Sequence, residues 1–134
     1  MQIHRFIEHV GELELELEAD SEAGVFAQAA TAFRELVDGT GVHGRPQRRT
    51  IDLAPEDDPP RLLADWIEEL VFLAEVHAFV PRRVVELDVR GGGIHATVEG
   101  DHGRPRHLIK AVALEDLELC RRQGRWYGHV VLDV

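Results

Sequence analysis

The chain has 134 residues, a formal net charge of −10, 44% apolar residues and 30% charged residues. This length and composition predict a single globular domain over residues 1–134, with enough apolar residues to bury a core without metal or disulfide cross-links. The negative charge argues against direct binding of nucleic acid, because contacts to phosphates need a basic surface, and it suits a protein that binds metal cations or a basic partner.

Cysteine content and hydropathy bear on where the protein works. Cys120 is the one cysteine, so no disulfide can form within the chain, and we expect a reducing, cytoplasmic environment. No apolar run is long enough to span a bilayer, and the opening MQIHRFIEHVGE lacks the layout of a signal peptide. We therefore expect no membrane association.

The first half of the chain predicts a strand, a helix, a short strand and a second helix. Leucine and glutamate alternate strictly over residues 13–19, which is typical of a half-buried strand with its leucines inward. Asp20 and Ser21 can cap a helix that Asp38-Gly39 ends. The segment RRTIDLA predicts a short strand, and a second helix follows PEDDPP, running from Arg61 to about His77, with Pro81 marking its end.

The second half predicts strands joined by tight turns. VVELDVR and IHATVEG flank a GGG turn and predict a hairpin, with Val85, Leu87 and Val89 among its inward residues. HLIKAVALEDLEL predicts a strand long enough to bend or bulge, RRQGR a turn, and WYGHVVLDV a last strand. The fold class expected is therefore α+β, with two helices packed on a largely antiparallel sheet.

The residues that could carry chemistry form no catalytic motif. The eight histidines lack zinc-site spacing, the single cysteine has no obvious base beside it, and the chain contains no GxSxG, P-loop or GxGxxG segment. We therefore predict no catalytic residues and no enzymatic activity. Lys110 is the only lysine, and two interpretations of it are open. It is either an exposed strand lysine or a basic group placed beside a functional acidic cluster.

Four segments, taken in order, resemble archease, the small protein that assists RNA-splicing ligases. HVGELE at residues 9–14 corresponds to the family's opening HTADIG-like segment, and LLADWIEELVF at 62–72 to its LLxxWLxELL helix. IKAVALE at 109–115 corresponds to an IKAVTYH-like segment, and GRWYGHVVLDV to a tryptophan-bearing last strand with an FDV- or FDI-like end. The match spans essentially the whole chain.

The resemblance implies a role and a site. It implies a cofactor protein for an RtcB-type RNA ligase, which joins a 3′-phosphate or cyclic-phosphate end to a 5′-hydroxyl with GTP and a divalent metal in tRNA processing. The family promotes guanylylation of the ligase histidine and repeated turnover, and binds a divalent cation, typically calcium. By position in the family's motifs, the cation ligands are Glu12, Asp133 and Val134, and the residues for activation and partner contact are Lys110, Glu35 and Glu115.

Elementary chemistry is compatible with this cation site. Calcium takes six to eight hard oxygen ligands, and Asp133, Glu12 and the Val134 main-chain carboxylate would supply three anionic groups. Tyr127, His129, Val131 and Asp133 alternate with the core side of the last strand, so Asp133 can share a face with Glu12 if the two strands are neighbours. Lys110 or a cation would relieve the repulsion between the carboxylates.

The chain departs from the family pattern at three places. The family's aspartate is Glu12 here, its Thr-Ala is Val10-Gly11, and its aromatic-His pair is Leu114-Glu115. These changes bear on the metal's identity more than on the fold. We interpret Glu14, Glu16 and Glu18 as a solvated strand face. Two rival functions are a metal-binding chaperone-like or scaffold protein with a non-ligase partner, and a small hydrolase or transferase.

Overall fold

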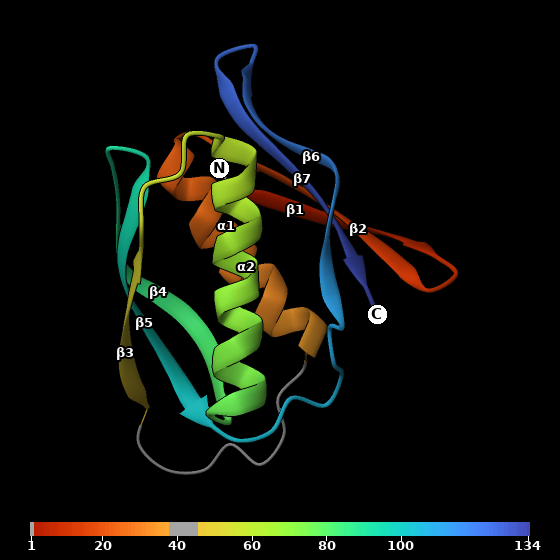
Figure 1. Ribbon diagram of the computed structural model, residues 1–134, viewed down its shortest axis with the longest axis vertical. Coiled ribbons are helices and arrows are strands. Elements are labelled where there is room, and N and C mark those ends of the chain that lie inside the picture. Colours follow the sequence, from red (N-terminus) through yellow and green to blue (C-terminus); the bar gives the residue numbers. More distant parts are fainter. Residues whose placement is uncertain (1, 38–45) are drawn as a thin grey trace.

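The computed structural model describes residues 2–37 and 46–134, which form an α+β fold of seven strands and two helices (Figure 1). The predicted helix end at Asp38-Gly39 and most of the loop after it lie outside the described residues. The strands are β1 (Ile3–His9), β2 (Glu12–Ala19), β3 (Gln47–Leu53), β4 (Phe79–Arg90), β5 (Gly93–His102), β6 (Ala111–Arg122) and β7 (Arg125–Asp133), and the helices are α1 (Glu22–Val37) and α2 (Pro59–Val76).

The strands form two antiparallel sheets, whereas the sequence predicted one. One sheet has the order β1-β2-β7-β6, and the other has the order β3-β5-β4. Both helices contact strands of both sheets, so the helix pair gives each sheet a face to bury (Figure 1). Local sequence specifies each hairpin but does not specify which strand edges pair, which is why the division into two sheets was not foreseen.

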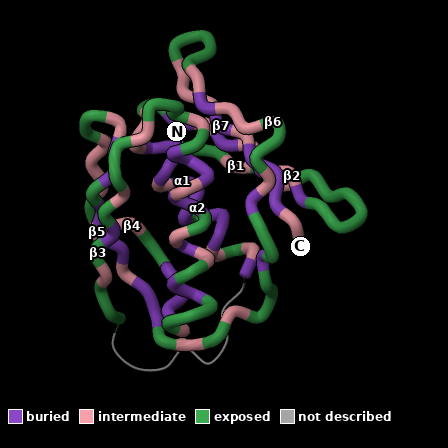
Figure 2. The backbone as a smooth tube through the Cα atoms, in the orientation of Figure 1, coloured by how far each residue is buried: buried purple, intermediate pink, exposed green. Residues whose placement is uncertain are grey.

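The core lies where the helices meet the sheets, and buried stretches gather there in Figure 2. In β2 the predicted alternation is confirmed, because Leu13, Leu15 and Leu17 are buried and each neighbouring glutamate is more exposed. Trp66 of α2 is fully buried and its indole N–H donates to the main-chain oxygen of Phe26 at 2.9 Å, which satisfies the polar end of a large core side chain. No helix in the described segments is long and apolar enough to cross a membrane.

The helix boundaries follow the predicted signals. The Ser21 hydroxyl accepts a hydrogen bond from the main-chain N–H of Gly24 at 3.0 Å, which caps α1. Pro59 stands in the first turn of α2, and the helix ends before His77. The next strand already begins at Phe79, so Pro81 lies inside β4 and not in a loop. Pro81 is tolerated there because β4 is an edge strand with a register shift between Pro81 and Arg83.

Two bulges change which side chains face the core. A register shift in β4 between Val84 and Glu86 puts Val84, not the predicted Val85, against the core with Leu87 and Val89. The bulge expected in β6 is confirmed: Ala113 pairs with Val131 while Glu118 pairs with His129, so β6 carries three more residues than β7 between these pairs. This bulge raises a short loop beside the outer face of the four-stranded sheet.

Leu17→Ala should test how much of the folding free energy depends on the buried face of β2. Leu17 is fully buried, so the substitution should lower the free energy of unfolding by roughly 2–5 kcal/mol, measured by urea denaturation. Ile3→Ala removes an exposed side chain from the opposite face of the same sheet and should cost less than about 1 kcal/mol. Equal losses in the two variants would contradict this assignment of the core.

Candidate functional site

The outer face of the four-stranded sheet carries the polar side chains of β2 and β7. Glu12 is the register partner of Asp133, and Glu16 is the partner of His129. Residues directly opposite in an antiparallel pair project to the same side, so the β2 glutamates and the β7 set ending in Asp133 share the face away from the helices. The expected neighbourhood of β2 and β7, on which the predicted site depended, is therefore present.

The C-terminus is fastened to the rest of the sheet through main-chain hydrogen bonds. The N–H of Val134 donates to the carbonyl of Gly11 at 3.2 Å, and the N–H of Lys110 donates to the carbonyl of Asp133 at 2.8 Å. These bonds hold the last two residues between the β1–β2 turn and the segment before β6. The predicted ligands Glu12, Asp133 and Val134 thus come together at one end of the sheet, with the main chain of Lys110 beside them.

A hollow of about 340 Å³ opens beside this end of the sheet. Its lining includes the Glu12 and Val134 of the predicted cation site, with apolar side chains on the other wall. The full lining is Glu8, His9, Glu12, Leu13, Leu36, His107, Leu108 and Val134.

The donor chemistry at this end fits a hard cation such as calcium. Glu12 and Asp133 supply two side-chain carboxylates, and the resemblance implies a third anionic ligand at Val134. Among residues 2–37 and 46–134, no three histidine, cysteine, aspartate or glutamate side chains are arranged to hold a metal ion. A cation here would therefore need the terminal carboxylate, main-chain carbonyls or water, and its binding stays a prediction.

Glu35 and Glu115 are not among the residues that line the hollow beside this end of the sheet. The Glu35 carboxylate accepts a hydrogen bond from His4 Nε2 at 2.7 Å, and the other His4 ring nitrogen meets the amide of Gln28. His4 is the register partner of Leu17, so this contact belongs to the helix side of the sheet. Glu115 is exposed in the β6 bulge, and its role stays a prediction.

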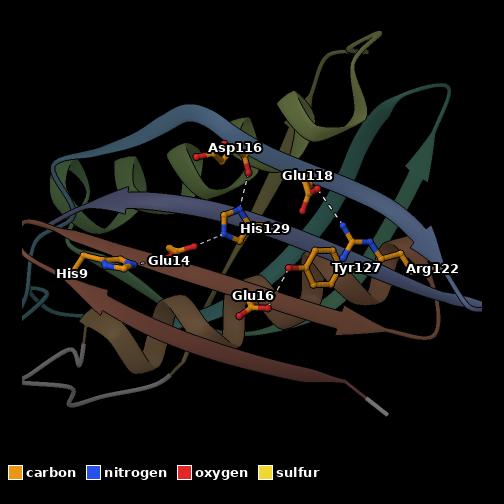
Figure 3. A network of polar contacts seen from close by, with 8 residues as sticks. All are labelled: His9, Glu14, Glu16, Asp116, Glu118, Arg122, Tyr127 and His129. Atoms are coloured by element: carbon orange, nitrogen blue, oxygen red, sulfur yellow. Dashed lines mark hydrogen bonds and ion pairs between the residues drawn. The ribbon is translucent and has the colours of Figure 1, made fainter.

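A polar network on the outer face was missed by sequence reasoning (Figure 3). The Glu14 carboxylate meets the Nε2 atoms of both His9 and His129, the latter at 2.9 Å. The Nδ1 of His129 reaches the main-chain carbonyl of Asp116 in the β6 bulge at 2.6 Å. Asp116 has a positive φ of 58°. The strand parity that places Asp133 outward also places His129 outward, so this signal was available, but the bulge contact was not.

The hydrogen-bond partners of His129 favour a proton on both ring nitrogens. A main-chain carbonyl can only accept, so Nδ1 donates to Asp116, and Nε2 faces the Glu14 carboxylate. Burial by itself lowers the pKa of His129, but the hydrogen bonds to Asp116 and Glu14 outweigh it and raise this pKa above its ordinary 6.5. Hydrogen bonds from His9, and then from His129, lower the pKa of Glu14 below 4.5.

The same face continues past this network towards the β6–β7 hairpin. The Tyr127 hydroxyl donates to Glu16 at 3.2 Å, and the Arg122 guanidinium lies 4.2 Å from the centre of the Tyr127 ring. Arg122 also pairs with Glu118 at 3.2 Å. Burial, followed by the charge of Glu16, raises the pKa of Tyr127. His129 of β7 thus offsets Glu14 of β2, and Arg122 offsets Glu118 within β6.

His129→Gln should make the free energy of unfolding fall less as the pH is raised to alkaline values. Because the pKa of His129 is raised in the folded protein, its contribution is complete below about pH 6.5 and is lost as pH rises through the folded-state value. Glu14 behaves oppositely: its contribution is complete above about pH 4.5 and is lost as pH falls through its lowered value. Both contributions are complete only between these two limits.

Urea unfolding of the wild type and the variant at about pH 6 and about pH 8.5 measures this difference. His102→Gln removes an exposed histidine from the other sheet. In this control the change in unfolding free energy between the two pH values should equal that of the wild type. If His129→Gln also shows the wild-type change in unfolding free energy between the two pH values, the proposed protonation of His129 is wrong.

Comparison with known proteins places the chain in a family. Residues 4–134 match the model of the Archease protein family (MTH1598/TM1083). A protein named "Protein archease" from Methanosarcina mazei is 30% identical over 141 residues, covering 98% of this chain and 95% of that protein. A protein of the same name from Methanosarcina acetivorans is also 30% identical with the same coverage.

Two solved structures share the fold. The solution structure of protein 1598 from Methanobacterium thermoautotrophicum aligns with a TM-score of 0.68 at 23% identity, covering 98% of both chains. The crystal structure of an archease, described as a possible chaperone, from Thermotoga maritima aligns with a TM-score of 0.67 at 17% identity, also covering 98% of both chains. With the family match over nearly its full length, the chain belongs to the archease family.

Proposed function

We propose that this archease is a protein activator of an RtcB-type RNA-splicing ligase, promoting guanylylation of the ligase and its repeated turnover. The observation that carries the proposal is the pairing of Glu12 with Asp133, which gathers the family-motif residues at one end of the sheet beside Lys110. Family membership supports the same role. In this proposal the protein acts by contact with the ligase and is not itself the catalyst.

Each residue at this end has a distinct task in the proposal. Glu12, Asp133 and the Val134 carboxylate hold a divalent cation, with calcium the best match to oxygen ligands. When bound, the cation supplies positive charge that neutralises these carboxylates. Lys110 is exposed and makes no hydrogen bond or ion pair through its side chain with any residue that the structure describes. Its ammonium group is therefore available to orient an acidic group or a nucleotide phosphate at the ligase.

An RNA-joining assay with limiting ligase tests the proposal. The cognate RtcB-type ligase, GTP and RNA are combined with or without this protein, and product per ligase is counted. We expect about one turnover without the protein and many with it. Lys110→Ala and Asp133→Asn should each reduce the stimulated rate by roughly tenfold or more, because each removes a charge placed at the guanylylation step.

The control is Asp52→Asn, which neutralises an exposed carboxylate on the other sheet and should leave stimulation unchanged. If a ligase of demonstrated competence gains nothing from the wild-type protein, the activator proposal is wrong, and a scaffold role with a different partner takes its place.

Calcium-induced thermal stabilisation tests the cation site without the ligase. A ligand that binds only the folded state raises the Tm, and Asp133→Asn deletes one of its anionic partners. The shift produced by calcium should therefore fall in the variant while remaining intact in Asp52→Asn. A C-terminal extension should have a similar effect, because it converts the Val134 carboxylate into an amide, whereas an extension at the N-terminus should not. Undiminished shifts in both altered proteins would exclude these ligands.

A further inference from the structure

Exposed apolar side chains gather where α2 ends. Val76 in the last turn of α2 is 63% exposed, Leu108 in the segment before β6 is 59% exposed, and Phe72 one turn earlier is 46% exposed. The Phe72 ring contacts the His77 ring edge-on at 5.2 Å between centroids. In Figure 1 the lower end of α2 and the segment leading from β5 to β6 lie side by side at the same end of the molecule. We call Val76 and Leu108, which line the same hollow, the apolar patch.

A hollow of about 620 Å³ lies within this patch. Its lining includes the apolar Val76 and Leu108 and the charged Glu75, Arg104 and Arg106. Leu108 also borders the 340 Å³ hollow that Glu12 and Val134 line. The apolar patch therefore continues, through one side chain, into the candidate cation site.

The charge of the residues that line the hollow is opposite to that of the whole protein. The chain carries a formal net charge of −10, whereas the hollow is lined by two exposed arginines, Arg104 and Arg106, against one exposed glutamate, Glu75. The side chain of Arg104 forms no hydrogen bond or ion pair with any residue in the described part of the chain, whereas Arg34 and Arg82 both pair with Asp101. An exposed cation beside exposed apolar side chains is complementary to a partner that brings a carboxylate and apolar groups together.

We propose that the apolar patch with Arg104 is the docking surface for an acidic, amphipathic segment of the ligase. The identity of the partner rests on the proposed function, while the chemistry of the segment follows from the patch. Its apolar side chains fill the hollow between Val76 and Leu108, and an aspartate or glutamate pairs with Arg104. Docking there leaves the neighbouring end of the sheet, with Glu12 and Lys110, facing the same partner.

Four substitutions at exposed residues test the docking surface. The Kd of each variant for the purified cognate ligase is measured by isothermal titration calorimetry. Leu108→Ser and Arg104→Glu should each raise Kd by roughly tenfold or more. The first substitution removes an apolar contact with the partner, and the second removes the cation that pairs with the partner's carboxylate. Ile3→Ser and Arg121→Glu are matched controls that make the same changes on β1 and near the β6–β7 hairpin, and their Kd should stay within about twofold of wild type. Unchanged Tm values establish that all four variants fold.

Charge reversal makes the test specific. Hydrogen exchange on the ligase locates the segment that wild-type protein protects, and we expect it to contain acidic residues. Replacing one of them with arginine should restore the affinity of Arg104→Glu and weaken that of the wild type. If Leu108→Ser and Arg104→Glu bind the ligase as tightly as wild type while wild type stimulates turnover, this inference is wrong and the activator proposal survives.

Three other outcomes would also overturn the docking surface. If the wild type neither binds nor stimulates the ligase, both the docking surface and the activator proposal fail. If sedimentation shows a wild-type dimer that Leu108→Ser and Arg104→Glu dissociate, the patch is covered by a second copy of this chain. If RNA alone binds the wild type and Arg104→Glu abolishes that binding, the arginine serves phosphates and not a carboxylate.

Discussion

The antiparallel pairing of β2 with β7 is the constraint on which both the core and the candidate site depend. It joins a strand near the N-terminus to the last strand of the chain and sets Leu15 opposite Val130 on the buried face. The same register sets Glu12 opposite Asp133 on the other face. A slip of one residue would turn the leucines to solvent and the glutamates into the core. The burial that stabilises the sheet therefore also fixes where the acidic groups meet.

The outer face tolerates its many carboxylates because cations lie among them. His129 donates to Glu14, Arg122 pairs with Glu118, and Arg125 pairs with Asp20. The His129 side chain joins β7 to β2 and to the β6 bulge, and Arg125 joins the β6–β7 hairpin to the residue after β2. These contacts stop short of Glu12 and Asp133, for which the structure of the described residues has no such compensating side-chain contact. The least neutralised carboxylates thus lie at the end of the sheet that the family motifs single out.

Strong periodicity and turn chemistry made much of the fold predictable. The leucines of residues 13–19, the Ser21 cap and the GGG turn each identified their elements, and strand parity placed Asp133 on the outer face. The N-terminal strand was missed because β1 is an edge strand whose residues are mostly exposed, which leaves no clear buried period. The His129–Asp116 contact was missed because it depends on where three extra residues of β6 bulge, and local sequence does not fix that register.

The two proposed surfaces are linked by a very short piece of chain. Leu108 lies on the apolar patch, and Lys110, two residues later, is fastened through its N–H to the carbonyl of Asp133. Ile109 between them is buried, so it anchors the segment to the core and limits independent movement of its neighbours. A partner held on the patch therefore lies at a fixed distance and orientation relative to Lys110. Binding energy gained at Leu108 and Arg104 can in this way be used to position charge at the adjacent end of the sheet.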